Sequence, residues 1–119
     1  MAWTIHYYTS PKGDSPIEQF LASLPEKARN KCLSYIELLR EREARLPRNY
    51  TGHVRGYLWE LRPEWGGVEF RLFYFLGTEQ RIFIVHAIIK KSQKLKATDI
   101  TLAENRIAEI RQREQEKEG

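Results

Sequence analysis

The sequence predicts an α+β fold in which helices pack on a small antiparallel sheet. Three runs rich in aromatic and β-branched residues, joined by short glycine-bearing connections, indicate a three-stranded meander over residues 57–62, 68–76 and 81–91. Apolar residues recur at helical spacing on both sides of this meander. With 119 residues the chain is long enough for one hydrophobic core but not two. We therefore expect a single domain over residues 1–119, with a frayed charged tail from about 113.

The segment before the meander is expected to contain a first strand and a helical hairpin. Polar and apolar residues alternate over residues 3–8, as in a half-buried strand. Turn-forming residues follow, and apolar side chains at helical spacing then predict helices at roughly 15–23 and 25–43, separated by Pro25. We expect the strand to join the sheet and the αα-hairpin to lie on it.

Two segments remain. Residues 46–56 contain one proline and two glycines and indicate a connector with at most a short strand. A last helix is expected from about 99 to 115, because residues suited to an N-cap precede an apolar stripe at helical spacing. The predicted order is therefore strand, two helices, three strands and a helix.

Charged residues of the meander suggest a register for the sheet. If Glu60 lies opposite Arg71, then Arg62 lies opposite Glu69, and both cross-strand pairs join opposite charges. The second hairpin then sets Arg71 opposite His86. One face would carry Glu60, Arg62, Arg71 and His86 together, a set that suits the binding of an anion better than a core.

Aromatic residues of the meander divide into two groups. The alternation assigns three of them to the core, namely Trp59, Phe70 and Tyr74, together with Leu72. Trp65 stands beside two glycines in a loop, where an exposed ring could stack on a base or contact a partner.

Composition restricts the function classes. Hydrophobic residues make up 41% and charged residues 30% of the chain, which is typical of a globular protein. The net charge of +4 is compatible with a nucleic-acid or acidic partner, and the segment from Ile88 to Lys96 contains four lysines and no acid. The single cysteine, Cys32, excludes an internal disulfide and is expected to be buried. No apolar run approaches the ~20 residues of a spanning helix, and no secretory signal is visible, so we expect a cytoplasmic protein with no membrane partner.

The chemistry that the sequence supports is RNA cleavage without a metal or cofactor. Nucleotide-binding loops and common hydrolase motifs are absent, and the three histidines lack metal-site spacing. What remains is arginine, lysine and histidine on a sheet face. These residues suit the attack of an RNA 2′-hydroxyl on its adjacent phosphate, which requires the phosphate to be oriented, charge to be neutralised and protons to be moved.

Three stretches carry a resemblance that covers nearly the whole chain. They are Leu58-Trp-Glu-Leu-Arg62, Phe70-Arg-Leu-Phe-Tyr74 and His86-Ala-Ile-Ile-Lys-Lys-Ser-Gln-Lys94. The sequence resembles the RelE/HigB superfamily of toxins, and it is most similar to the HigB-type branch. The resemblance implies a RelE-like fold, a cytosolic toxin that cleaves messenger RNA on the ribosome, and a cognate antitoxin. In this branch the antitoxin is often a HigA-like helix-turn-helix protein, through which alone the complex would contact operator DNA.

The resemblance also implies roles for particular residues. Arg71 matches an arginine that contacts the scissile phosphate, and Lys90 and Lys91 match a basic pair, which gives three catalytic candidates. Candidates for RNA binding are Arg62, His86 and Lys94. The chain departs from the pattern in two ways: Ile89 replaces an aromatic residue before the lysine pair, and no tyrosine follows Tyr74. A lysine or histidine would have to replace that tyrosine.

Other interpretations remain open at this point. Arg71 could be one half of a cross-strand ion pair with Glu60, the lysine cluster could be a solvated loop, and His86 could be a partly buried structural residue. The whole chain could be a ParE-like inhibitor of DNA gyrase that acts by binding, or an RNA-binding module without catalysis. If the first hypothesis is right, Arg71→Ala should abolish toxicity while leaving the fold intact.

Overall fold

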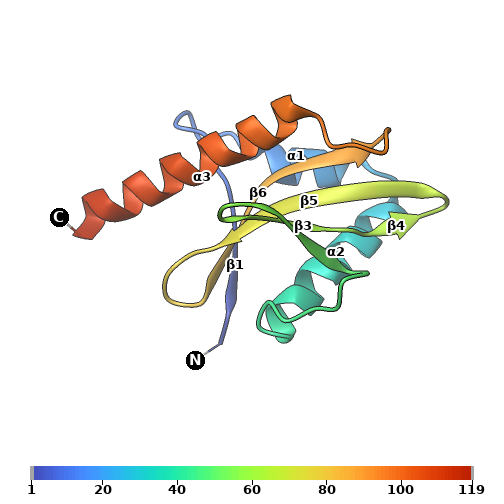
Figure 1. Ribbon diagram of the computed structural model, residues 1–119, viewed down its shortest axis with the longest axis horizontal. Coiled ribbons are helices and arrows are strands. Elements are labelled where there is room, and N and C mark those ends of the chain that lie inside the picture. The colour runs from blue at the N-terminus through green and yellow to red at the C-terminus, as the bar shows by residue number, and fades with distance from the viewer. Residues whose placement is uncertain (1, 119) are drawn as a thin grey trace.

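The computed structural model describes residues 2–118 and has the predicted α+β class (Figure 1). Its elements are β1 (Thr4–Tyr7), α1 (Pro16–Ser23), α2 (Glu26–Glu41), β2 (Thr51–Arg55), β3 (Leu58–Leu61), β4 (Glu64–Trp65), β5 (Val68–Leu76), β6 (Arg81–Lys90) and α3 (Ala97–Glu118). Helix α3 continues through residues 113–118, part of the segment expected to fray; Gly119 lies outside the described residues.

The sheet is mixed rather than wholly antiparallel. Its strand order is β1-β6-β5-β3-β2, and the short β4 pairs with β5. Strand β1 runs parallel to β6, whereas the other pairs are antiparallel. The connector of residues 46–56, where we expected at most a short strand, contains the five-residue edge strand β2.

Both faces of the sheet are covered at its centre. Leu72 and Phe73 are consecutive in β5, so their side chains point to opposite faces, yet both are fully buried. Figure 1 shows α3 along one side of the sheet and α2 on the other. The α3 side is the face of His86, since that side chain hydrogen-bonds Asp99 of α3. The expected charged sheet face, open to an anion, is therefore absent at the centre of the sheet.

Turns between the strands set a register that differs from the predicted one. Gly66 and Gly67 both have positive φ and form a two-residue turn between β4 and β5, which places Glu60 opposite Phe73. The shift from the expected pairing is two residues, an even number. Glu60 and Arg71 therefore still share a face, but as diagonal neighbours.

The hairpin of β5 and β6 differs for another reason. Gly77 donates to the carbonyl of Arg81, so three residues form the loop where we expected two. The register shifts again between Phe73 and Tyr74, because β6 has one extra residue there, a β-bulge. His86 consequently pairs with Phe73, and Arg71 pairs with Ile88.

Most of the predicted core is confirmed. Phe70, Leu72 and Tyr74 are at most 2% exposed, and Cys32 is fully buried. Burial raises the pKa of the Cys32 thiol to about 11, so the thiol stays protonated at neutral pH. Trp59 is the exception: it is 36% exposed on β3, which lies next to the edge strand β2.

Candidate functional site

Arg71 lies inside the protein, with only 6% of its side chain exposed. Its Nη1 donates to the carbonyl oxygen of Phe70 at 2.8 Å, and its Nη2 donates to Glu69 Oε1 at 3.1 Å. Its Nε lies 3.5 Å from Glu60 Oε2, too far for a hydrogen bond in this arrangement. Each guanidinium nitrogen thus faces an acceptor. Of these three acceptors only the Glu69 carboxylate lies at the surface, with its side chain 50% exposed.

Glu60 joins two arginines. Its Oε2 lies 3.5 Å from Arg71 Nε and accepts a hydrogen bond of 2.7 Å from Arg62 Nε. Arg62 also donates to the carbonyl oxygen of Arg48 and remains partly exposed. Glu60 is 8% exposed, and its Oε1 has no hydrogen-bond partner among the described residues. The predicted ion pair of Glu60 with Arg71 is present, and it is part of a larger network.

The lysine pair meets this network through Glu69. Lys90 is the cross-strand neighbour of Glu69, and both line a surface hollow of about 310 Å³ together with Lys91. A second hollow of about 240 Å³ lies beside it and is lined by Lys94 and Lys96 as well as by the lysine pair. The lysines therefore cluster at the end of β6 beside the exposed carboxylate that holds Arg71. We call Arg71, Glu69, Lys90 and Lys91 the basic corner.

His86 lies apart from that cluster, between the sheet and α3. Its Nε2 is 2.8 Å from Asp99 Oδ1, its ring stacks on Phe73 with centroids 5.7 Å apart, and 14% of its side chain is exposed. Burial lowers the pKa of His86, and nearby Arg106 lowers it further, whereas the hydrogen bond and charge of Asp99 raise it. The histidine helps to attach α3 to the sheet. It lies on the same face of the sheet as Arg71, but it packs under α3 rather than in the solvent-exposed lysine cluster.

Replacing His86 with glutamine should weaken the effect of acid on stability. Because the pKa of His86 is lowered in the folded protein, the unfolded chain binds more protons as the pH falls below about 6.5, and the fold loses stability there. Glutamine can still donate to Asp99 but does not titrate. We expect the Tm of H86Q to fall less than that of the wild type between about pH 7 and pH 5. An exposed histidine gives the control, H53Q, and equal Tm losses in wild type and H86Q would contradict the assignment.

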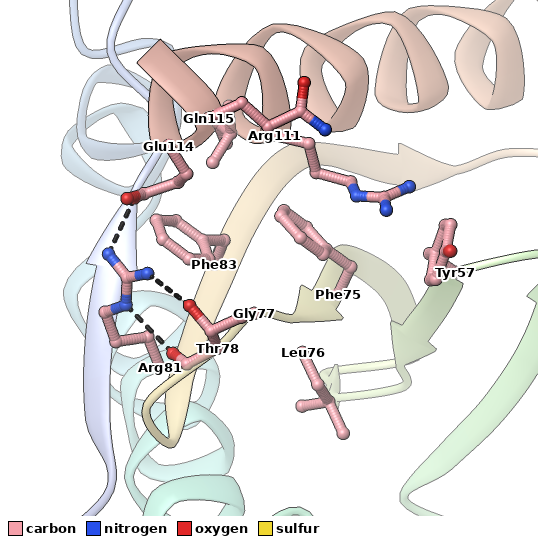
Figure 2. Close-up of a pocket in the computed structure, with 11 residues that line it drawn as sticks. Tyr57, Phe75, Leu76, Gly77, Thr78, Arg81, Phe83, Arg111, Glu114 and Gln115 are labelled. Atoms are coloured by element: carbon pink, nitrogen blue, oxygen red, sulfur yellow. Dashed lines mark hydrogen bonds and ion pairs between the residues drawn. The ribbon is translucent and has the colours of Figure 1, made fainter. Parts of the chain in front are cut away.

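Another hollow lies at the opposite end of the strands, between α3 and the loop of β5 and β6 (Figure 2). Its volume is about 350 Å³, and the rings of Phe75 and Phe83 lie 5.1 Å apart in it. Figure 2 shows Arg111 extended toward the exposed Tyr57, whose ring centroid is 4.2 Å from the guanidinium carbon. None of the predicted site residues lines this hollow.

Sequence reasoning missed the role of Glu69. The expected register gave this carboxylate to Arg62, whereas the structure gives it to Arg71. The signal was present as an acid two residues before the arginine on the same strand, and therefore on the same face. Among the described residues, no group of three His, Cys, Asp or Glu side chains could hold a metal ion. No helix within residues 2–118 is long and apolar enough to span a membrane.

The fold is consistent with the small RelE-like class, and the family that the chain matches is a RelE-like toxin family of toxin–antitoxin systems. More particularly, the chain belongs to the family of phage-derived Gp49-like proteins (DUF891), which residues 19–108 match. The RelE-like part of the resemblance is thereby confirmed, and membership implies an antitoxin as a partner. None of the curated proteins compared with the chain matches it.

Proposed function

We propose that this protein is a HigB-type toxin: a metal-independent, ribosome-dependent messenger RNA endoribonuclease, neutralised by a HigA-like helix-turn-helix antitoxin. The observation that supports it best is the basic corner, in which the Arg71 guanidinium bonds an exposed carboxylate, Glu69, and that carboxylate lines a hollow together with two lysines. Arg71, Lys90 and Lys91 are its catalytic residues. Arg62 and Lys94 contact RNA, and His86 acts indirectly by positioning α3.

In this mechanism the scissile phosphate takes the place of Glu69 on Arg71. Arg71 Nη2 is the guanidinium nitrogen bonded to an exposed side chain, so it is the one a phosphate oxygen can reach once Glu69 moves away. The RNA 2′-oxygen attacks phosphorus and gives its proton to a solvent water, and the bond from phosphorus to the 5′-oxygen breaks, which leaves a 2′,3′-cyclic phosphate and a 5′-hydroxyl end. Lys90 or Lys91 neutralises the developing charge and donates a proton to the leaving 5′-oxygen.

Removing the Glu69 charge should strengthen RNA binding. Glu69→Gln frees Arg71 from a competing anion and removes a negative charge beside Lys90, an effect on the scale of an exposed ion pair, about 1 kcal/mol. We expect about fivefold tighter binding of a 2′-O-methyl oligonucleotide, which cannot be cleaved, in fluorescence anisotropy. The control is Glu64→Gln, since Glu64 is the exposed cross-strand neighbour of Glu69 on β4. If both variants tighten binding equally, general charge explains the effect and Glu69 does not compete with phosphate.

Primer extension on messenger RNA tests the activity itself. New 5′ ends should follow induction of the wild type, require translation, and disappear when Arg71 is replaced with lysine. Binding of RNA without cleavage would instead indicate a non-catalytic RNA-binding module. Intact messages despite growth arrest would contradict the nuclease proposal.

A second candidate is a ParE-like inhibitor of DNA gyrase that acts by binding. The observation in its favour is the aromatic hollow under α3, where Tyr57 is 58% exposed and Arg111 lies at the rim (Figure 2). Such a surface suits a protein partner, and it uses no catalytic residue. Supercoiling by purified gyrase separates the candidates, because a nuclease leaves the reaction unchanged.

A further inference from the structure

Trp59 is exposed in an unusual place. It lies in the middle of β3 between Leu58 and Glu60, both of which are buried. Its ring contacts that of His53, its cross-strand neighbour on the edge strand β2, with centroids 4.8 Å apart and planes at 47°. A tryptophan that remains 36% exposed inside a sheet presents a large ring surface for stacking to a ligand.

This pair of rings opens into a hollow at the edge of the sheet, which we call the edge hollow. Its volume is about 400 Å³, within the range of about 300–1,000 Å³ for small-molecule sites. Arg48 and Arg62 line it together with Trp59 and His53, and no acidic residue does. Among the described residues, the Arg48 side chain has no acidic partner, and it is exposed. The edge hollow thus combines stacking rings with positive charge.

The absence of a side chain at Gly52 of β2 leaves the space that the Arg62 guanidinium occupies. A Cβ added at Gly52 would lie within 3 Å of the Arg62 guanidinium, so a larger residue would displace that side chain. Arg62 is also fixed by Glu60 and by the carbonyl oxygen of Arg48. Its guanidinium is therefore pre-organised at the hollow rather than free in solvent.

The edge hollow and the basic corner are connected by side chains. Arg62, which lines the edge hollow, shares Glu60 with Arg71. Arg71 in turn bonds Glu69, which lines the hollow beside Lys90. The two hollows are thus linked through Arg71, although Trp59 lies on the opposite face of the sheet, since Trp59 pairs with Tyr74 whereas Glu60 pairs with Phe73. This arrangement fits a chain of phosphates that turns round the edge of the sheet and carries a base at one end.

We propose that the edge hollow is a nucleotide subsite for single-stranded RNA, in which a base stacks on Trp59 and His53 and its phosphate binds Arg62 and Arg48. The inference rests on the proposed function, because it gives the RNA that Arg71 cleaves a path round the edge of the sheet, from the face of Arg71 to the face of Trp59. Stacking accepts any base, so the subsite contributes affinity and position more than sequence preference. The ligand class is a single-stranded oligonucleotide.

The test measures binding of a labelled 2′-O-methyl RNA oligonucleotide to the full chain by fluorescence anisotropy. Trp59→Ala should weaken binding about tenfold, since one stacked base is lost, and Trp59→Phe should retain most of the affinity because a phenyl ring still stacks. Trp65→Ala is the matched control, because Trp65 is 43% exposed on β4 near Lys27 but does not line the edge hollow. Arg48→Ala should reduce the slope of the logarithm of the binding constant against the logarithm of the salt concentration by about one, the value for one phosphate contact.

The results distinguish this subsite from the nuclease proposal. Equal binding by the Trp59 and Trp65 alanine variants, or a loss confined to Trp65→Ala, overturns the subsite and leaves cleavage to be judged by primer extension. Failure of the wild type to bind the oligonucleotide overturns the subsite as well, whatever primer extension shows. If Trp59→Ala does not fold, the test uses Trp59→Phe and Arg48→Ala instead. RNA binding by Arg48→Ala with the same salt dependence as the wild type then overturns the subsite.

Discussion

Lysine at position 71 should lower messenger RNA cleavage at least about a hundredfold, the usual effect of losing one charge-stabilising donor in a transition state. Phe70 and Glu60 hold the Arg71 guanidinium plane so that its Nη2 points to the surface, whereas a lysine ammonium is a point charge that cannot keep these contacts together. Primer extension after induction measures cleavage, and the Tm of the purified variant shows whether the fold is retained.

Lysine is a better replacement than alanine because Arg71 is buried. Alanine would leave the buried Glu60 with Arg62 alone, and removing one partner of a buried ion pair costs up to about 3–5 kcal/mol. Loss of toxicity in Arg71→Ala could then reflect unfolding, so our sequence-based expectation of an intact fold does not suit this position. Lysine keeps the positive charge next to Glu60.

A matched control is Arg81→Lys at the other end of the strands. Arg81 is also partly buried and ion-paired, with its Nη1 2.6 Å from Glu114, but it lies in the hollow of Figure 2 and away from the basic corner. We expect this variant to cleave as the wild type does. Wild-type cleavage by a folded Arg71→Lys protein would show that Arg71 is structural and that the catalytic assignment is wrong.

The elements of the fold could be predicted because local patterns determine them. The helices begin within two residues of their expected positions, and the meander strands lie where the aromatic and β-branched runs are. The register could not be predicted, because one extra residue changes it. The β-bulge after Phe73 and the three-residue loop at 78–80 each shift the pairing by one.

Long-range contacts limited the prediction of the candidate site. Alternation placed Glu60, Arg71 and His86 on one face correctly, but it carries no information on what covers that face. Helix α3 returns over His86, and Arg71 is enclosed by its own strand and by Glu60, so the exposed part of this network consists of Glu69, the lysines and part of Arg62. The same limit explains Trp59, since the edge position of β2 decides its exposure.

Replacing Glu60 with glutamine should have the largest effect on stability. The carboxylate neutralises two guanidiniums, of which Arg71 is buried, so its loss leaves a buried positive charge with less compensation and two like charges close together. We expect the free energy of unfolding, measured by urea denaturation, to fall by about 3–5 kcal/mol. The exposed Glu64→Gln should change it by at most about 0.5 kcal/mol.

A double replacement separates this structural role from the chemistry. When Glu60→Leu is combined with Arg71→Met, the buried charges disappear together, and apolar side chains of similar volume often restore the stability of such a pair. We expect the double variant to unfold near the wild-type urea concentration but to cleave no messenger RNA. A Glu60→Gln variant within about 1 kcal/mol of the wild type would show that water or Glu69 already compensates Arg71. Cleavage by the stable double variant would instead remove Arg71 from the mechanism, because the fold would be present without its guanidinium.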